Sequence, residues 1–138
     1  MNHKEFLERM NIHTVTVAQA KERIPLIKPI LSELVEKYKL FDERSIHLLK
    51  VSKGNHEVAK ISQVKYETDL LEEELEELRQ KLVMLDCVVK DWRTGLVDFV
   101  YESGETIVWL CFQHGEDELQ FYHYWDAGFR GRRKIDFE

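Results

Sequence analysis

The sequence is short of the residues on which several classes of protein depend. It has two cysteines, Cys87 and Cys111, among 138 residues, too few for the disulfide framework of a small secreted domain. No apolar run approaches the roughly 18 residues that a membrane span needs. Residues 1–10 lack an apolar core segment and a small-residue cleavage site, so we expect no signal peptide. These absences predict a cytoplasmic protein that is not inserted in a membrane and whose cysteines stay reduced.

Excess positive charge is also missing. Twenty Lys and Arg residues stand against 26 Asp and Glu residues, for a net charge of −6, so bulk electrostatics does not predict nucleic-acid binding. The sequence has no Walker loop, no Gly-x-Ser-x-Gly, no His-Glu-x-x-His and no Cys-x-x-Cys. No enzyme class and no cofactor is therefore predicted, and a non-enzymatic role is favoured over an enzymatic one.

The strongest positive signal is a repeat of apolar residues every three and four positions. It runs through residues 27–48 and again through 64–85, and the two runs are separated by Gly54 and Asn55. Two helices of this kind joined by a short turn favour an antiparallel hairpin that packs like a coiled coil. We therefore predict a long helical hairpin over residues 16–86.

The start of the hairpin carries two further signals. Thr16 and Gln19 have the spacing of a capping box, which predicts that the first helix begins there. Pro25 and Pro29 lie inside the helical pattern, and proline removes an amide donor and clashes with the preceding turn. We therefore expect a kink or short break near residues 21–25. Residues 1–15 are expected to form an N-terminal arm, either a short amphipathic helix or a loose segment.

After residue 86 the apolar period changes to two, which is typical of strands. The chain is therefore predicted to be a single α+β domain, residues 1–138, in which the hairpin is followed by a four-stranded antiparallel β-meander over 87–125. Residues 126–138 form a basic, glycine-rich tail. The predicted strands are 87–92, 96–101, 105–113 and 119–125.

Turn positions predict how the strands pair. A turn at Ser103 and Gly104 places Asp98 opposite Trp109, and a tight turn at Glu116 and Asp117 pairs Leu110 with His123. His123 is then expected on the face that packs against the helices. Cys111 is expected on the opposite face, together with Asp98. That second face is predicted to suit a partner, because it would present side-chain types enriched at interfaces. These are Trp109, Tyr122 and Tyr124.

Several segments together resemble a known family. They include Asp98 within Thr94–Phe99, Cys111 within Val108–Phe112, Glu116 after Gly115, and His123 followed by Asp126-Ala127-Gly128-Phe129 and Gly131-Arg132. With the opening Thr16–Ala20 and the two prolines, this pattern over roughly residues 15–135 resembles DUF2203, a bacterial family of unknown function. The resemblance implies a cytoplasmic bacterial protein and implies no activity.

The spacing of Cys111, His114, His123 and Asp126 resembles that of metal ligands, and transition metals prefer these residue types. Because the predicted register puts Cys111 and His123 on opposite faces, we predict no metal. We expect the tail to dock on the end of the sheet, because Phe129 is apolar and docking would remove it from water. We expect Arg132 to pair there with a carboxylate, with Asp126 the leading candidate.

Two hypotheses for function remain. The first is a non-enzymatic protein-interaction module, homodimeric through the hairpin and the second sheet face, with no nucleic acid or membrane among its partners. The alternative is a protein that binds a small ligand or an anion, an enzyme included. Its site would be built from His123, Asp126 and Arg132, with Asp98 as a further candidate because a carboxylate interrupts an apolar strand there.

Overall fold

A computed structural model describes residues 2–54, 56–104 and 106–138 of the chain. Within that part of the chain, no helix is both long and apolar enough to cross a membrane. The helices are α1 (His3–Met10), α2 (Val17–Lys53), α3 (Val58–Val83) and the 3-10 helix η1 (Phe129–Gly131). The strands are β1 (Val88–Asp91), β2 (Leu96–Ser103), β3 (Thr106–Gln113), β4 (Phe121–Tyr124) and β5 (Arg133–Lys134).

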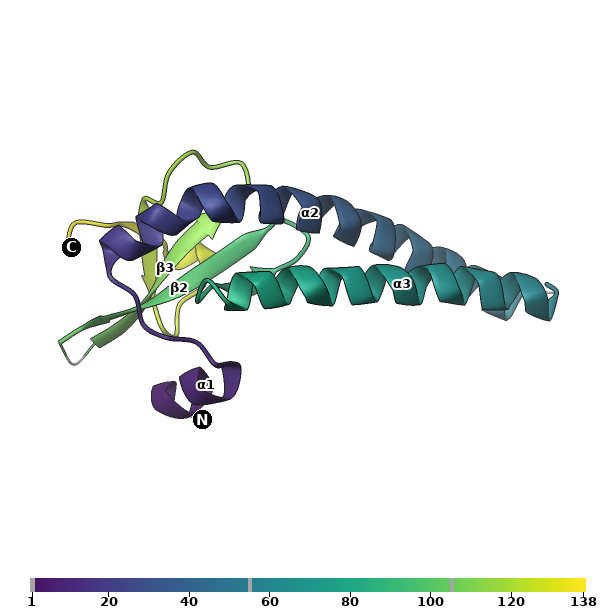
Figure 1. The fold of residues 1–138 in the computed structure, drawn as a ribbon, viewed down its shortest axis with the longest axis horizontal. Coiled ribbons are helices and arrows are strands. Elements are labelled where there is room, and N and C mark those ends of the chain that lie inside the picture. The colour runs from purple at the N-terminus through teal and green to yellow at the C-terminus, as the bar shows by residue number, and fades with distance from the viewer. Residues whose placement is uncertain (1, 55, 105) are drawn as a thin grey trace.

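The predicted helical hairpin is confirmed. The Thr16 hydroxyl accepts a hydrogen bond from the Gln19 amide, and the Gln19 side chain accepts one from the Thr16 amide, so a complete capping box begins α2. Helices α2 and α3 lie side by side where they extend away from the sheet (Figure 1), and Lys37 forms a 2.8 Å ion pair with Glu74 between them. The side chains buried between these helices and the sheet include Ile27, Leu31 and Leu34 of α2 and Leu75, Leu78 and Leu82 of α3.

Of the expected kink or short break at the prolines, the break is wrong, because α2 continues from Val17 to Lys53 through both Pro25 and Pro29. The two prolines are exposed and lie four residues apart, on one face of the helix. Each leaves the carbonyl four residues before it without an amide donor. On an exposed face that carbonyl can bond to water, so the helix is weakened there without being interrupted.

The sheet has five antiparallel strands in the order β1-β2-β3-β4-β5, one more than predicted. The additional strand comes from the tail, which was predicted to dock and does so. Tyr122 pairs with Arg133, and the Ile135 amide donates to the Gln120 carbonyl at 2.8 Å. The tail thus runs back along β4 and covers what would otherwise be an exposed edge.

The two faces of the sheet have different covers. One face packs on α2 and α3 through a large apolar core that includes Phe99, Leu110 and Phe112. The other face is covered by α1, which lies on the side of the sheet away from the hairpin (Figure 1), with Phe6 edge-on to Trp109. The N-terminal arm is therefore a helix with its own small core. Part of the hairpin does not pack against the sheet, because it extends past it (Figure 1).

Candidate functional site

The register of β3 and β4 differs from the prediction in a way that creates the candidate site. Cys111 pairs with Phe121 and Trp109 pairs with His123, one residue away from the predicted pairing. A one-residue slip moves every side chain of a strand to the other face. His123 therefore lies on the same face as Cys111, and the predicted placement on the helix-facing side is wrong. The β2–β3 register also differs, by two residues, which preserves the faces and brings Asp98 opposite Cys111.

The loop between the two strands explains the slip. Instead of a tight turn at 116 and 117, the chain turns earlier, where the Gln113 amide donates to the Glu116 carboxylate at 2.6 Å and the Glu116 amide donates to the Gln113 carbonyl. The chain then has room to bury Leu119 in the main core before β4 begins. The connection between paired residues of β3 and β4 is thus one residue longer than predicted. The side chains of β4 therefore point to the opposite faces from those predicted.

Three side chains with metal-ligating or titratable groups meet as a result: Asp98 of β2, Cys111 of β3 and His123 of β4. One ligand atom from each lies within 4.8 Å of the others, and all three residues are buried. Asp98 and Cys111 are fully buried and His123 is 4% exposed. We call this group the buried triad.

His123 is held at both ring nitrogens. Nε2 lies 2.9 Å from Asp98 Oδ2, and Nδ1 lies 2.9 Å from the Tyr124 carbonyl oxygen. A carbonyl only accepts, so Nδ1 carries a proton, and a second proton is shared between Nε2 and the carboxylate. Burial lowers the pKa of His123, but the hydrogen bonds to Asp98 and to the carbonyl outweigh it, so the net pKa is raised.

Asp98 and Cys111 complete the triad. Among the described residues Asp98 Oδ1 has no hydrogen-bond partner although it is buried. Burial, and then the charge of Asp98, raises the pKa of the Cys111 thiol, so the thiol is protonated at neutral pH. The triad therefore holds one orphaned oxygen and two displaceable protons, one on the thiol and one in the His123–Asp98 pair.

Arg132 does pair with a carboxylate at the end of the sheet, but with Glu116 and not with the predicted Asp126. Its Nη2 donates to Glu116 at 2.6 Å and to the Cys111 carbonyl at 3.1 Å, while the guanidinium lies over Phe121. Asp126 is exposed, and within the described part of the chain it has no ion pair with Arg132 or His123. The predicted grouping of His123, Asp126 and Arg132 is thus replaced by two pairs, His123–Asp98 and Arg132–Glu116.

The predicted interaction residues do not share a face. Trp109 is buried beneath α1, stacked on Trp125 at 4.4 Å with the Lys90 ammonium 3.6 Å from its ring. Tyr122 and Tyr124 point to the opposite side, where Tyr122 contacts Phe137 of the tail. Because the slip of β4 separates them, Trp109 is part of the α1 core rather than of an exposed surface.

Sequence reasoning missed an apolar groove where the hairpin leaves the sheet. The cavity has a volume of ≈ 440 Å³. The Trp92 ring, in the turn between β1 and β2, stacks on Tyr38 at 6.2 Å. Tyr38 falls in the helical repeat and Trp92 at the end of a strand, so neither position signalled a shared surface. The groove is lined by Tyr38, Phe41, Glu72, Leu75, Glu76 and Trp92.

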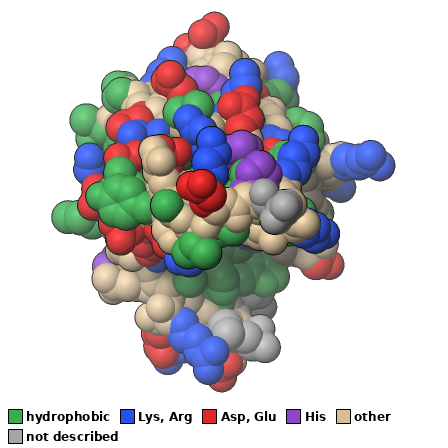
Figure 2. All heavy atoms as spheres, turned by 90° about the vertical axis from the view of Figure 1, so that its right-hand side faces the viewer, with side chains coloured by type: hydrophobic (Ala, Val, Ile, Leu, Met, Phe, Trp, Pro, Cys, Tyr) green, Lys and Arg blue, Asp and Glu red, His purple; other side chains and the backbone are tan. Residues whose placement is uncertain are grey.

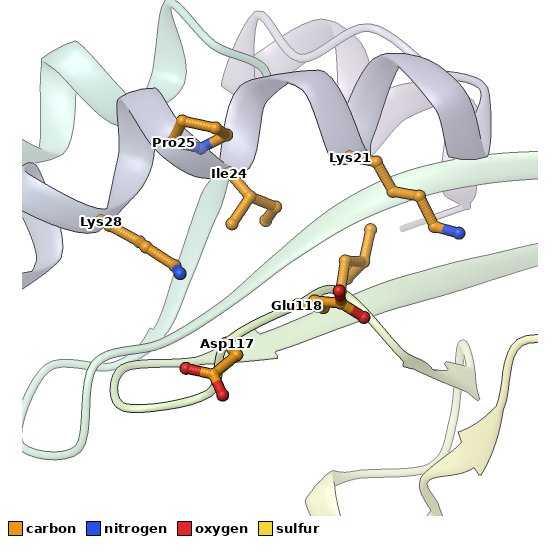
Figure 3. Close-up of a pocket in the computed structure, with 7 residues that line it drawn as sticks. Lys21, Ile24, Pro25, Lys28, Asp117 and Glu118 are labelled. Carbon is orange, nitrogen blue, oxygen red and sulfur yellow. The ribbon is translucent and has the colours of Figure 1, made fainter.

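A second cleft, of ≈ 350 Å³, lies between the first turns of α2 and the β3–β4 loop. Figure 3 shows Lys21 and Lys28 reaching from α2 toward the loop that carries Asp117 and Glu118. Charges of both signs line this cleft, so it does not favour an anion or a cation.

Comparison with known proteins adds a family and no activity. The family model described as "Uncharacterized conserved protein (DUF2203)" matches residues 13–135, and the chain therefore belongs to that family. No curated protein and no solved structure matches the chain. Of the described elements, α1 lies outside the matched residues, whereas the buried triad lies within them.

Proposed function

We propose that this protein is a non-enzymatic interaction module that forms a homodimer through the free part of its helical hairpin. We define the hairpin arm as residues 43–53 of α2 and 58–71 of α3. Arg93, in the turn after β1, reaches Asp42 at 3.4 Å, and the arm begins immediately beyond that contact. With both cysteines unpaired, the proposal places the module in the cytoplasm.

The observation that carries the proposal is the apolar surface of the arm. Seen end on, this part of the molecule shows hydrophobic side chains among charges of both signs (Figure 2). Large apolar side chains that gather on one part of a surface indicate an interaction site. Those of the arm that are at least 44% exposed are Ile46, Leu49, Val58, Tyr66 and Leu70.

The charges of the arm are compatible with a second copy as the partner. Within the arm, α2 has three Lys and Arg residues and one Glu, whereas α3 has two Lys residues and two acidic residues. A two-fold axis places the same surface on both subunits, so α2 of one copy can lie against α3 of the other. The net positive charge of α2 in the arm then faces a segment of α3 with no net charge, so like-charge repulsion does not oppose association.

Analytical ultracentrifugation of the whole protein over a range of concentrations tests the proposal. We expect a dimer for the wild type, and a monomer for Tyr66→Gln/Leu70→Gln, which removes two exposed apolar side chains from α3 and keeps good helix formers. The matched control is Met84→Gln, because Met84 is 84% exposed but lies beyond the end of α3, outside the arm.

Three results decide the matter. A dimer that is lost in the Tyr66→Gln/Leu70→Gln variant and kept in the Met84→Gln control supports the proposal. The two variants must melt at the same temperature as the wild type, so that loss of the dimer is not loss of the fold. A wild type that stays monomeric at every concentration, or a dimer that the arm variant does not weaken, contradicts the proposal.

A further inference from the structure

We propose that Asp98, Cys111 and His123 bind a divalent transition-metal ion, with zinc the best fit. This inference is independent of the dimer and replaces the expectation that the chain has no metal site. That expectation rested on Cys111 and His123 lying on opposite faces of the sheet, and the observed register places them on the same face.

The three ligand atoms are close enough together to bind one metal ion after small shifts. Zinc binds sulfur at about 2.3 Å and nitrogen or oxygen at about 2.0–2.2 Å, so ligand atoms of one zinc ion lie roughly 3.3–3.8 Å apart. The three ligand atoms of the triad lie within 4.8 Å of one another. The carboxylate and imidazole, now 2.9 Å apart, must separate slightly, and the thiol must approach. Three neighbouring strands supply one ligand each, which fixes the backbone positions.

The surroundings of the ligands fit a metal in two ways. His123 Nδ1 donates to the Tyr124 carbonyl, the backbone contact that typically orients a metal-ligating histidine and leaves Nε2 for the ion. Asp98 Oδ1 is fully buried without a hydrogen-bond partner within the described residues. Such an oxygen is costly unless something pairs with it, and a cation beside the carboxylate would do so.

Charge balance points to a divalent ion. A thiolate, a carboxylate and a neutral imidazole together carry a charge of −2, so a divalent cation leaves no net charge inside the fold, where uncompensated charge is expensive. The donor set of sulfur, nitrogen and oxygen suits zinc and its neighbours, and does not suit magnesium or calcium, which prefer oxygen alone. Three protein ligands leave the fourth position for water or another small ligand.

The test uses the full chain, reduced and stripped of metal with a chelator. We expect the wild type to bind one equivalent of Zn²⁺ and to melt at a higher temperature with it. The Co²⁺ form should show the near-ultraviolet absorption of a thiolate–cobalt bond. Cys111→Ala should lose that absorption and the thermal shift. Cys87→Ala is the matched control, since Cys87 is the second buried free cysteine and lies outside the triad.

A second variant guards against loss of fold. Cys111→Ser keeps the size of the side chain and should weaken zinc binding at least 10-fold while the circular dichroism spectrum stays that of the wild type. His123→Ala should also abolish binding. The proposal is overturned if the wild type binds no zinc in the reduced state, if Cys111→Ala binds zinc as the wild type does, or if cobalt absorption is lost only in Cys87→Ala.

Discussion

The contact between His123 and Asp98 gives the sharpest prediction, because it joins two buried groups at 2.9 Å. His123→Ala leaves the Asp98 carboxylate in the interior with neither oxygen paired, since Oδ1 already lacks a partner among the described residues. Removal of one member of a buried charged pair costs about 3–5 kcal/mol. A domain of this kind is stable by roughly 5–15 kcal/mol, so the loss should be obvious in urea unfolding of the metal-free protein.

Loss of the imidazole also leaves a cavity, and a second substitution separates the two effects. Asp98→Asn in the His123→Ala background removes the unpaired charge and leaves the cavity unchanged. We expect the double variant to be more stable than His123→Ala alone by more than about 1 kcal/mol. If the double variant is no more stable, the cost of His123→Ala is that of the cavity, and our account of the pair is refuted.

The same pair predicts how stability depends on pH. The pKa of His123 is raised in the folded protein, so the folded state binds the proton more tightly than the unfolded chain does. Its contribution is fully present below the unfolded pKa of about 6.5 and is lost as the pH rises through the folded pKa. The metal-free wild type should therefore lose stability over that interval relative to the His123→Ala/Asp98→Asn variant, which lacks both members of the pair, and parallel curves for the two proteins would contradict the argument.

Three further predictions concern the rest of the fold, each measured as a change in the free energy of unfolding. Leu75→Asp should unfold the protein or cost several kcal/mol, since it places an unpaired charge in the buried seam; a melting temperature like that of the wild type would contradict the seam. Arg132→Lys should cost about 1–3 kcal/mol through loss of hydrogen bonds to Glu116 and the Cys111 carbonyl. Asp126→Asn should change stability by less than about 0.5 kcal/mol. Equal effects of the two substitutions would contradict the pairing of Arg132 with Glu116. Pro29→Ala should stabilise the protein by up to about 3 kcal/mol, because it restores an amide donor inside α2; no gain would mean that the helix is already relaxed around the proline.

The sequence predicts the hairpin well because its determinants are local. A capping box at Thr16 and an apolar repeat at helical spacing depend on residues within a few positions of one another. The prolines mislead for the same reason. Their cost is local, but whether a helix continues past them depends on the packing of the opposite face, which includes Ile27 and Leu31 against the sheet. That packing involves residues distant in the sequence.

Single site residues could be predicted, whereas their grouping could not. His123, Arg132 and Asp98 stand out as polar residues in or beside apolar strands, and each does have a specific partner in the structure. The partners of His123 and Arg132 were not predicted. Glu116 could have been noticed, since it lies within a segment that resembles the family. The sequence predicts a turn there but no partner for its carboxylate.

The loop between β3 and β4 determines whether the buried triad exists. A loop one residue shorter would have placed His123 among the apolar side chains under α2 and left Asp98 buried alone, which is an expensive arrangement. In the observed register His123 lies beside the Asp98 carboxylate and pairs with it. Two contacts determine this register: Glu116 closes the turn early, and Leu119 enters the core. Glu116 also binds Arg132, which holds the Cys111 carbonyl. The same carboxylate thus fixes the register of β4 and anchors the tail beside the strand that supplies the thiol, so the register and the site depend on one set of side chains.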